Sequence, residues 1–276
     1  MTLAEWRARF GHPWPLIGVV HLLPLPGSPL YGGSFEEVLR RAEEDARAYE
    51  EAGFDAVIVE NFGDRPFFPS RVPRETVAAM AVAAWVVRKS IELPVGVNVL
   101  RSDGPSALAI ATVVGAQFVR VNVHVGAVVT DQGLIEGKAW ETLRLRRALG
   151  SPVSILADLR VKHAAPLVSR ELRVEALEAV ERGLADAVII TGESTGQIAR
   201  LEEFREVREA LQDVPVLAGS GVTSANLGSV LPWTDGAIVG TSVKCSGKVT
   251  EPVDRERVRE LRQVRDALLE QYPTRR

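Results

Sequence analysis

Eight short β-rich runs alternate with longer amphipathic stretches along this chain, and that alternation constrains the fold more than any other feature. The runs lie at residues 16–20, 56–60, 95–99, 118–123, 153–158, 187–191, 216–219 and 236–240. Eight strands alternating with helices in 276 residues are typical of a closed parallel barrel. The sequence therefore predicts the α/β class and a single (β/α)8 TIM barrel over residues 1–276, with 1–13 as an N-terminal extension and 272–276 as a C-terminal tail.

An open, doubly wound sheet is the alternative fold. It usually has fewer strands and a glycine-rich loop after the first one, whereas the first run here continues as HLLPLP from His21. Helix signals support the barrel: Ser34 and Glu37 form a capping box that opens a helix, and Gly53 ends it. Pro105 fits the first turn of another helix. Further helices are expected near residues 170–182, 197–212 and 253–271.

Composition excludes several classes of protein. The chain has 33 basic and 36 acidic residues, a net charge of −3, and 46% hydrophobic residues, which excludes a disordered chain. Nucleic acid is not an expected partner, because binding it usually needs a basic face. Cys245 is the only cysteine, so no intramolecular disulfide or cysteine-rich metal site can form, and a cytoplasmic location fits.

The longest apolar run, residues 77–87, has the sequence VAAMAVAAWVV. It is well short of the roughly 20 residues that a membrane span needs, so no membrane span is expected. Its helix would be apolar nearly all round, which indicates burial on two sides. The second side is most simply a subunit interface, and we expect a homo-oligomer formed through this region.

Side-chain parity predicts which polar residues face the barrel axis. In the fourth run, Val119, Val121 and Val123 suit the helix-packed outer face, which leaves the alternate residues for the interior. Applied to every run, this reasoning gathers polar side chains at the C-terminal mouth, where barrels of this type carry their active sites. The gathered residues are His21, Glu60, Asn98, Arg120, Asn122, His124, Asp158 and Thr191, with Lys162 and His163 in the loop after the fifth run.

These residue types indicate acid–base chemistry. A buried Arg120 needs a carboxylate partner, either Glu60 or Asp158, because an unpaired buried charge is costly. The second acid then remains as a general base, with His21 or His124 as acid or electrophile. Substrate orientation falls to the remaining polar residues of the mouth, namely Asn98, Arg120, Asn122, Lys162 and Thr191.

No cofactor is predicted from these residues. A divalent metal held by Glu60, Asp158 and His124 is an alternative that no His-x-x-x-His or EF-hand spacing supports. Each histidine taken singly also fits a purely structural role, and Arg120 with one acid fits a structural ion pair. A Schiff-base role for Lys162 would require burial that lowers its pKa. Because Lys162 lies in a loop, we expect it to contact a phosphate or carboxylate instead.

Small, glycine-rich turns follow the last three runs. In many barrels the loops after strands 7 and 8 hold a phosphate through backbone N–H groups, and glycine lets the backbone approach the anion closely. The expected phosphate-binding residues are Gly192, Gly219, Ser220, Gly221, Gly240, Thr241 and Ser242, with Lys244 as added charge and residues 191–196 as a third turn. Plain tight turns are the alternative for each loop. The sequence contains neither G-x-x-x-x-G-K-[ST] nor G-x-G-x-x-G, which disfavours nucleotide triphosphates and dinucleotides.

Two longer loops, residues 21–33 and 125–137, could cover the mouth as lids.

Several of the segments named above also resemble a known family. They are IGVVHLLPLPGSP at 17–29, VENFGD at 59–64, RVNVH at 120–124, ADLRVKH at 157–163 and GSGV at 219–222.

These segments resemble the BtpA family, which includes SgcQ-type proteins, over about residues 14–270. The resemblance implies a barrel similar to the ribulose-phosphate-binding group. It also implies a link to photosystem I biogenesis in cyanobacteria, with a membrane-peripheral location in a phototroph, or to sugar metabolism. It carries over no catalytic residue.

Three functions are therefore expected to compete. The first is an enzyme, a phosphosugar-type isomerase, lyase or transferase, that acts on a small sugar-phosphate or nucleoside-like phosphate. The second is a photosystem I biogenesis or stability factor without turnover. The third is a ligand-sensing barrel that binds phosphate but does not catalyse.

Overall fold

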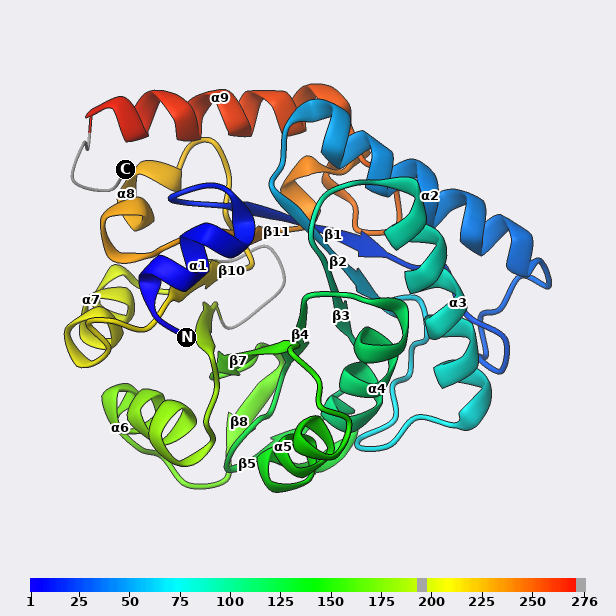
Figure 1. Cartoon of the computed structure of the whole chain (residues 1–276), viewed down its shortest axis with the longest axis horizontal. Coiled ribbons are helices and arrows are strands. Elements are labelled where there is room, and N and C mark those ends of the chain that lie inside the picture. The colour runs from blue at the N-terminus through cyan, green and yellow to red at the C-terminus, as the bar shows by residue number, and fades with distance from the viewer. Residues whose placement is uncertain (193–197, 272–276) are drawn as a thin grey trace.

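The computed structural model describes residues 1–192 and 198–271. Its centre is a closed barrel of parallel strands, in which β1 pairs with both β2 and β11 and every other barrel strand pairs with its two neighbours (Figure 1). The barrel strands are β1 (Leu16–His21), β2 (Ala56–Glu60), β3 (Val95–Asn98), β4 (Phe118–Val121), β7 (Ser154–Leu159), β9 (Ala187–Thr191), β10 (Val216–Gly219) and β11 (Ala237–Val239). The predicted (β/α)8 barrel is confirmed.

Helices cover the outside of the barrel (Figure 1). They are α2 (Phe35–Ala52), α3 (Arg74–Ser90), α4 (Gly104–Val114), α5 (Ala139–Ala148), α6 (Leu172–Leu177) with the π-helical turn η1 (Glu178–Arg182), α7 (Leu201–Ala210), α8 (Leu227–Val230) with η2 (Leu231–Trp233), and α9 (Arg255–Gln271). In the predicted capping box of α2, Ser34 Oγ accepts from Glu37 N at 3.2 Å. The reciprocal half is not formed, because the Glu37 carboxylate bonds to Arg40 at 2.6 Å.

Two hydrophobic layers hold the barrel. The outer layer packs the strands against the helices. The inner layer fills the barrel and includes Ile17, Val19, Ile58, Phe118, Leu156, Ile189 and Ile238, as alternation along each strand requires. Gly96 faces the same interior, and a Cβ at that position would overlap the Phe118 ring. The inward parity predicted for β2, β3 and β7 is therefore confirmed.

The segment expected to be an N-terminal extension closes one end of the barrel. Helix α1 (Leu3–Phe10) lies over the strands in Figure 1, and its Trp6 and Phe10 belong to the interior hydrophobic cluster. The Trp6 indole donates to the Asp235 carbonyl at 2.9 Å. The Phe10 and Phe118 ring centroids are 5.4 Å apart. Since Phe118 begins its strand, α1 plugs the end opposite the polar mouth.

At the mouth, the loops after β4 and β7 form a small antiparallel sheet. It consists of β5 (Ala127–Thr130), β6 (Gly133–Glu136) and β8 (Ala164–Pro166), in the order β6-β5-β8. The turn between β5 and β6 places Gly133 at φ 92°, a conformation that glycine adopts without strain. A segment expected to be a loop is thus a β-hairpin extended by a third strand.

Helix α3 contains the apolar run at residues 77–87. Met80, Ala83 and Val87 are buried against the core, whereas Val82 and Trp85 are 44% and 47% exposed. One face of α3 is therefore buried within this chain, and the opposite face is exposed. Across residues 1–192 and 198–271, the structure contains no helix with both the length and the apolar character of a membrane span.

Candidate functional site

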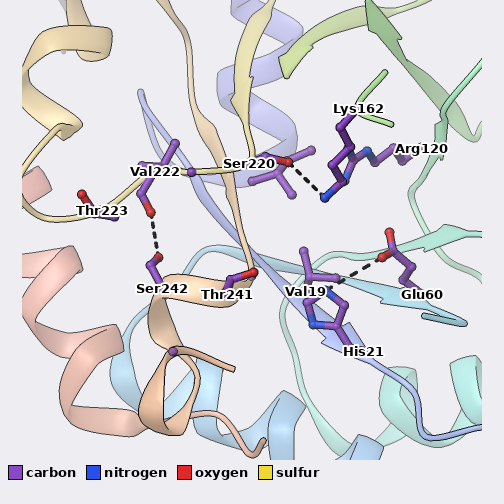
Figure 2. A pocket seen from close by; sticks show the side chains of 14 residues that line it. Val19, His21, Glu60, Arg120, Lys162, Ser220, Val222, Thr223, Thr241 and Ser242 are labelled. Atoms are coloured by element: carbon purple, nitrogen blue, oxygen red, sulfur yellow. Dashed lines mark hydrogen bonds and ion pairs between the residues drawn. The ribbon is translucent and has the colours of Figure 1, made fainter. Parts of the chain in front are cut away.

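The C-terminal mouth contains a cavity of about 180 Å³ between strands and loops that are distant in sequence (Figure 2). Side chains from β1, β2 and β4 form one wall, and the loops after β7, β10 and β11 form the rest. Nine residues selected from the sequence line it: His21, Glu60, Arg120, Lys162, Ser220, Gly221, Gly240, Thr241 and Ser242. Val222 and Thr223 also line it and were not selected; they directly continue the Gly219–Gly221 loop, which was the available signal.

The pairing register explains why four of the polar side chains meet. His21 lies opposite Glu60, Glu60 opposite Asn98, and Asn98 opposite Arg120 on consecutive strands. Residues that pair in register on neighbouring parallel strands point to the same face, so the four side chains form one row inside the barrel. The row is buried, with Glu60, Asn98 and Arg120 each 6% exposed or less.

The two acids of the mouth have different partners. Asp158 accepts from Arg120 Nε at 3.0 Å and from Nη2 at 2.9 Å, and its Oδ2 also accepts from Asn122 Nδ2 at 2.7 Å. Its side chain is fully buried. This is a bidentate ion pair with its oxygens already occupied. The tertiary structure thus assigns Asp158, rather than Glu60, as the partner of Arg120.

Glu60 is the acid that remains. Its Oε2 accepts from Asn98 Nδ2 at 2.6 Å, and its Oε1 lies 3.8 Å from His21 Nε2. Among the ion pairs of the described residues, none joins Glu60 to a lysine or arginine within 4.0 Å. A buried carboxylate that lines a cavity without a fixed cation is suited to proton transfer.

His21 stands beside Glu60 as a neutral imidazole. Burial holds its pKa well below the ordinary 6.5, and the positive charges of Lys244, Lys162 and Arg120 lower it further. Gly240 makes room for the ring, because a Cβ there would lie 2.8 Å from His21 Cε1. Within the described part of the chain, His21 Nδ1 is buried without a hydrogen-bond partner. A neutral imidazole can donate or accept one hydrogen bond to a bound molecule.

The loops after β10 and β11 meet at the cavity and are tied together. Ser242 Oγ donates to the Val222 carbonyl at 2.7 Å, so this hydroxyl joins the two loops. Ser220 and Gly221 have φ angles of 67° and 68°, which turns the chain sharply at the cavity edge. Within the described part of the chain, the backbone N–H groups of Gly221 and Val222 donate no hydrogen bond. Successive amides in such a turn form an anion-binding concavity.

Some of the selected residues lie elsewhere. Gly219 packs inside the barrel, where a Cβ would collide with Ile189. Lys244 is fully buried and bonds to Asp45 at 2.6 Å, so it does not serve the phosphate loop directly. His124 Nε2 bonds to the Gly183 carbonyl at 2.7 Å, and His124 lines neither described cavity.

A second cavity, of about 740 Å³, lies beside β8. Four of the selected residues line it instead of the first cavity: Asn122, Asp158, Thr191 and Gly192. Thr191 Oγ1 donates to the Arg160 carbonyl at 3.1 Å. Of the third turn expected after strand six, residues 193–196 lie outside the described residues.

The three residues considered for a metal are dispersed. Glu60 lines the first cavity, Asp158 is bound to Arg120, and His124 is bound to Gly183. Over residues 1–192 and 198–271, no three His, Cys, Asp or Glu side chains are grouped so that they could hold a metal ion.

One residue that supports the site was not selected from the sequence. Arg101 Nη2 donates to the Lys162 carbonyl and so anchors the loop that carries Lys162. Its only sequence signal was its place just after the third strand.

Comparison with known proteins gives matches over most of the chain. The sequence model of the BtpA family matches residues 13–266. An uncharacterised protein of Pyrococcus furiosus is 49% identical over 92% of this chain and 96% of its own length. The photosystem I biogenesis protein BtpA of Synechocystis is 48% identical over 88% of this chain and 85% of its own length.

Solved structures with the same fold are much more distant in sequence. Thiamine phosphate pyrophosphorylase from Pyrococcus furiosus has a TM-score of 0.59 at 18% identity and covers 93% of this chain and 98% of its own. N-(5'-phosphoribosyl)anthranilate isomerase from the same organism has a TM-score of 0.58 at 16% identity, with 92% and 99% covered. At such identities the likeness supports the barrel fold alone.

Proposed function

The chain belongs to the BtpA family, and we propose that it is an enzyme that binds a small phosphorylated ligand at the barrel mouth and moves a proton within it. One observation carries the proposal. Glu60, a buried acid that forms no ion pair with a lysine or arginine of the described residues, shares a cavity with a neutral His21 and with the paired loops after β10 and β11. A structural ion pair does not need this arrangement, since Arg120 is already satisfied by Asp158.

The phosphate half of the site is the turn at Ser220–Val222 together with Gly240–Ser242. The amides of Gly221 and Val222 and the hydroxyl of Thr241 supply donors at the cavity edge. The cavity of about 180 Å³ is small, so it suits a small metabolite rather than a large ligand. The names of two structural neighbours, thiamine phosphate pyrophosphorylase and phosphoribosylanthranilate isomerase, also contain phosphorylated compounds.

The chemical half is Glu60 with His21. Glu60 is the general base that takes a proton from the ligand. His21, neutral because its pKa is lowered by burial and by neighbouring cations, donates a hydrogen bond to the oxygen on which charge develops. Asn98 holds Glu60 in place, and Arg120 adds positive charge to the same wall. Such a pair serves isomerase, lyase or transferase chemistry, because each of these reaction types can proceed through a proton transfer.

Thermal unfolding in the presence of phosphorylated metabolites tests the binding. A ligand at 100 times its dissociation constant stabilises the folded state by about 2.7 kcal/mol. The Thr241→Val variant removes one donor and should weaken this stabilisation. Thr250→Val, at an exposed position outside the cavity, serves as its control. Equal stabilisation by phosphorylated and unphosphorylated forms of the same compounds would refute the proposal.

A role in photosystem I biogenesis is the second candidate, favoured by the name of the Synechocystis relative. An uncharacterised relative from Pyrococcus furiosus has a similar identity, 49%, so the family name alone does not carry this role to the present chain. If the role depends on protein contacts alone, the Glu60→Gln variant should restore photosystem I fully in a cyanobacterium that lacks its own BtpA protein.

The third candidate function, a ligand-sensing barrel, predicts ligand binding without turnover. A cytoplasmic location and self-association through residues 77–87 stay predictions, and sedimentation of a Trp85→Glu variant tests the latter.

A further inference from the structure

We infer that Lys162 forms a covalent imine with the carbonyl carbon of the phosphorylated ligand, so that the substrate class is a phosphorylated aldehyde or ketone. This inference rests on the proposed function of the same cavity and specifies its chemistry. It is carried by the position and partners of Lys162, which the acid–base pair of Glu60 and His21 leaves unexplained.

The Lys162 amine points into the cavity. Figure 2 shows the side chain reaching past Arg120, with its nitrogen toward Ser220, and Nζ donates to Ser220 Oγ at 3.3 Å. The hydroxyl is a partner that a neutral amine also keeps, because it can donate to the nitrogen lone pair as well as accept from N–H. Glu60 and His21 line the same cavity.

Lys162 makes no close ion pair: among the ion pairs of the described residues, none within 4.0 Å involves Lys162. Lys244 is the contrasting case, since its ammonium is buried against Asp45 at 2.6 Å. A lysine kept to hold a fold needs such a partner when it leaves water. Lys162 instead lines the cavity, which fits a group that reacts with a bound molecule.

The surroundings of Lys162 favour the uncharged amine. Burial lowers the pKa of Lys162 below its ordinary 10.5, and the nearby Arg120 guanidinium lowers it further, while the Glu60 and Asp158 carboxylates oppose part of this shift. Arg101 Nη2 donates to the Lys162 carbonyl, which anchors the backbone of the loop that carries the amine. Desolvation and a neighbouring cation are the two means by which proteins make lysine nucleophilic toward carbonyl groups.

The step balances with groups present in the cavity. Lys162 Nζ attacks the carbonyl carbon, a C–N bond forms, and the π electrons move to the oxygen. Glu60 accepts a proton from the attacking nitrogen and passes it to the oxygen, which gives a neutral carbinolamine. Glu60 then takes the remaining proton of the nitrogen and passes it to the hydroxyl, which leaves as water as the nitrogen lone pair forms C=N. One carbonyl and one amine become one imine and one water, without a redox change.

Borohydride trapping tests the inference. The protein is incubated with dihydroxyacetone phosphate or glyceraldehyde 3-phosphate and treated with sodium borohydride, which reduces an imine to a stable secondary amine. Because the chain has five lysines, digestion and mass spectrometry can assign the adduct. We expect the adduct on Lys162, its suppression by inorganic phosphate, and its loss in Lys162→Met and Lys162→Arg. Lys248→Met, at an exposed position, should label as the unchanged protein does.

The outcomes separate this inference from the proposed function. Thermal stabilisation is measured in parallel with glycerol 3-phosphate, which has no carbonyl group. Stabilisation by all three phosphates without an adduct on Lys162 overturns the imine and leaves the proposed function standing. An adduct on Lys162 with unphosphorylated glyceraldehyde, insensitive to inorganic phosphate, supports the imine and overturns the phosphate site. Equal labelling of Lys89, Lys162 and Lys248 overturns the inference, because it shows no selectivity for the cavity. A folded Lys162→Arg variant that binds the phosphates without labelling excludes loss of structure as the cause.

Discussion

Replacing each acid of the mouth by its amide should separate structure from chemistry. In Asp158→Asn, the Arg120 guanidinium loses the charge that balances it, although the shape of the side chain is kept. Three hydrogen bonds of 2.7–3.0 Å converge on the Asp158 carboxylate in a fully buried place. Removing one partner of a buried ion pair costs about 3–5 kcal/mol, because the other charge is left uncompensated.

The matched variant, Glu60→Gln, should cost far less stability. Glu60 has one short hydrogen bond, from Asn98 at 2.6 Å, and the neutral His21 at 3.8 Å. Changing a hydrogen bond to a charged group into one between neutral groups costs about 1 kcal/mol. Turnover should fall far more, since losing a general base removes on the order of 10²–10⁴ in rate.

Thermal unfolding followed by circular dichroism measures the contrast without knowledge of the substrate. Each kcal/mol lowers Tm by about 2–4 °C in domains of comparable size, so we expect a drop of about 6–20 °C for Asp158→Asn and of about 2–4 °C for Glu60→Gln. The double variant Arg120→Met/Asp158→Leu should recover part of the loss, because it leaves no unpaired charge. Equal Tm values for Asp158→Asn and the unchanged protein, or a larger drop for Glu60→Gln, would refute this assignment of the two acids.

Two further predictions concern packing and pH. Gly96→Ala should destabilise by about 1–3 kcal/mol, because the added Cβ overlaps the Phe118 ring and forces overpacking; Gly32→Ala, where a Cβ meets nothing within 4 Å, should stay near the unchanged protein in urea unfolding. Burial, and then nearby cations, lower the pKa of His21, so the unfolded chain binds more protons than the folded one below an unfolded pKa of about 6.5. Stability should therefore be full above about pH 6.5 and fall on acidification, by up to about 1.4 kcal/mol per pH unit from this group. His21→Gln should flatten that dependence, and an unchanged slope would show that His21 is not the group responsible.

Local patterns in the sequence determined a large part of this fold. The predicted runs at 56–60, 187–191 and 216–219 match β2, β9 and β10 residue for residue, because alternation and flanking turns are local signals. The runs of β4 and β11 were predicted too long. Asn122 and Val123 continue the alternation beyond β4, and Gly236 and Gly240 flank the apolar residues of β11 without marking its ends. The segment that forms helix α1 was predicted to be only an N-terminal extension. The pattern of its eight residues does not indicate which surface Trp6 and Phe10 will cover.

Side-chain direction within strands was also available from the sequence, and it brought His21, Glu60 and Arg120 to one cavity. Residues beyond strand ends were harder to place. His124 follows the parity of Arg120 but lies three residues after β4 ends, where the backbone no longer alternates, and it bonds to Gly183 instead. Lys244 follows the loop after β11, yet its long side chain reaches Asp45 on α2.

The sequence by itself determined that eight strands would close and that acids, amides and imidazoles would gather at their C-terminal ends, because both follow from short-range periodicity and from the geometry of parallel strands. Only the tertiary structure decided which acid neutralises Arg120. The register sets Arg120 opposite Leu156, so Asp158 stands two residues further along the neighbouring strand and reaches the guanidinium with both oxygens. Glu60 keeps an amide and an imidazole as its partners, and Lys162 forms no ion pair within 4.0 Å with an acid of residues 1–192 or 198–271. Such pairings depend on the stagger between strands some 40 residues apart, which no local pattern encodes.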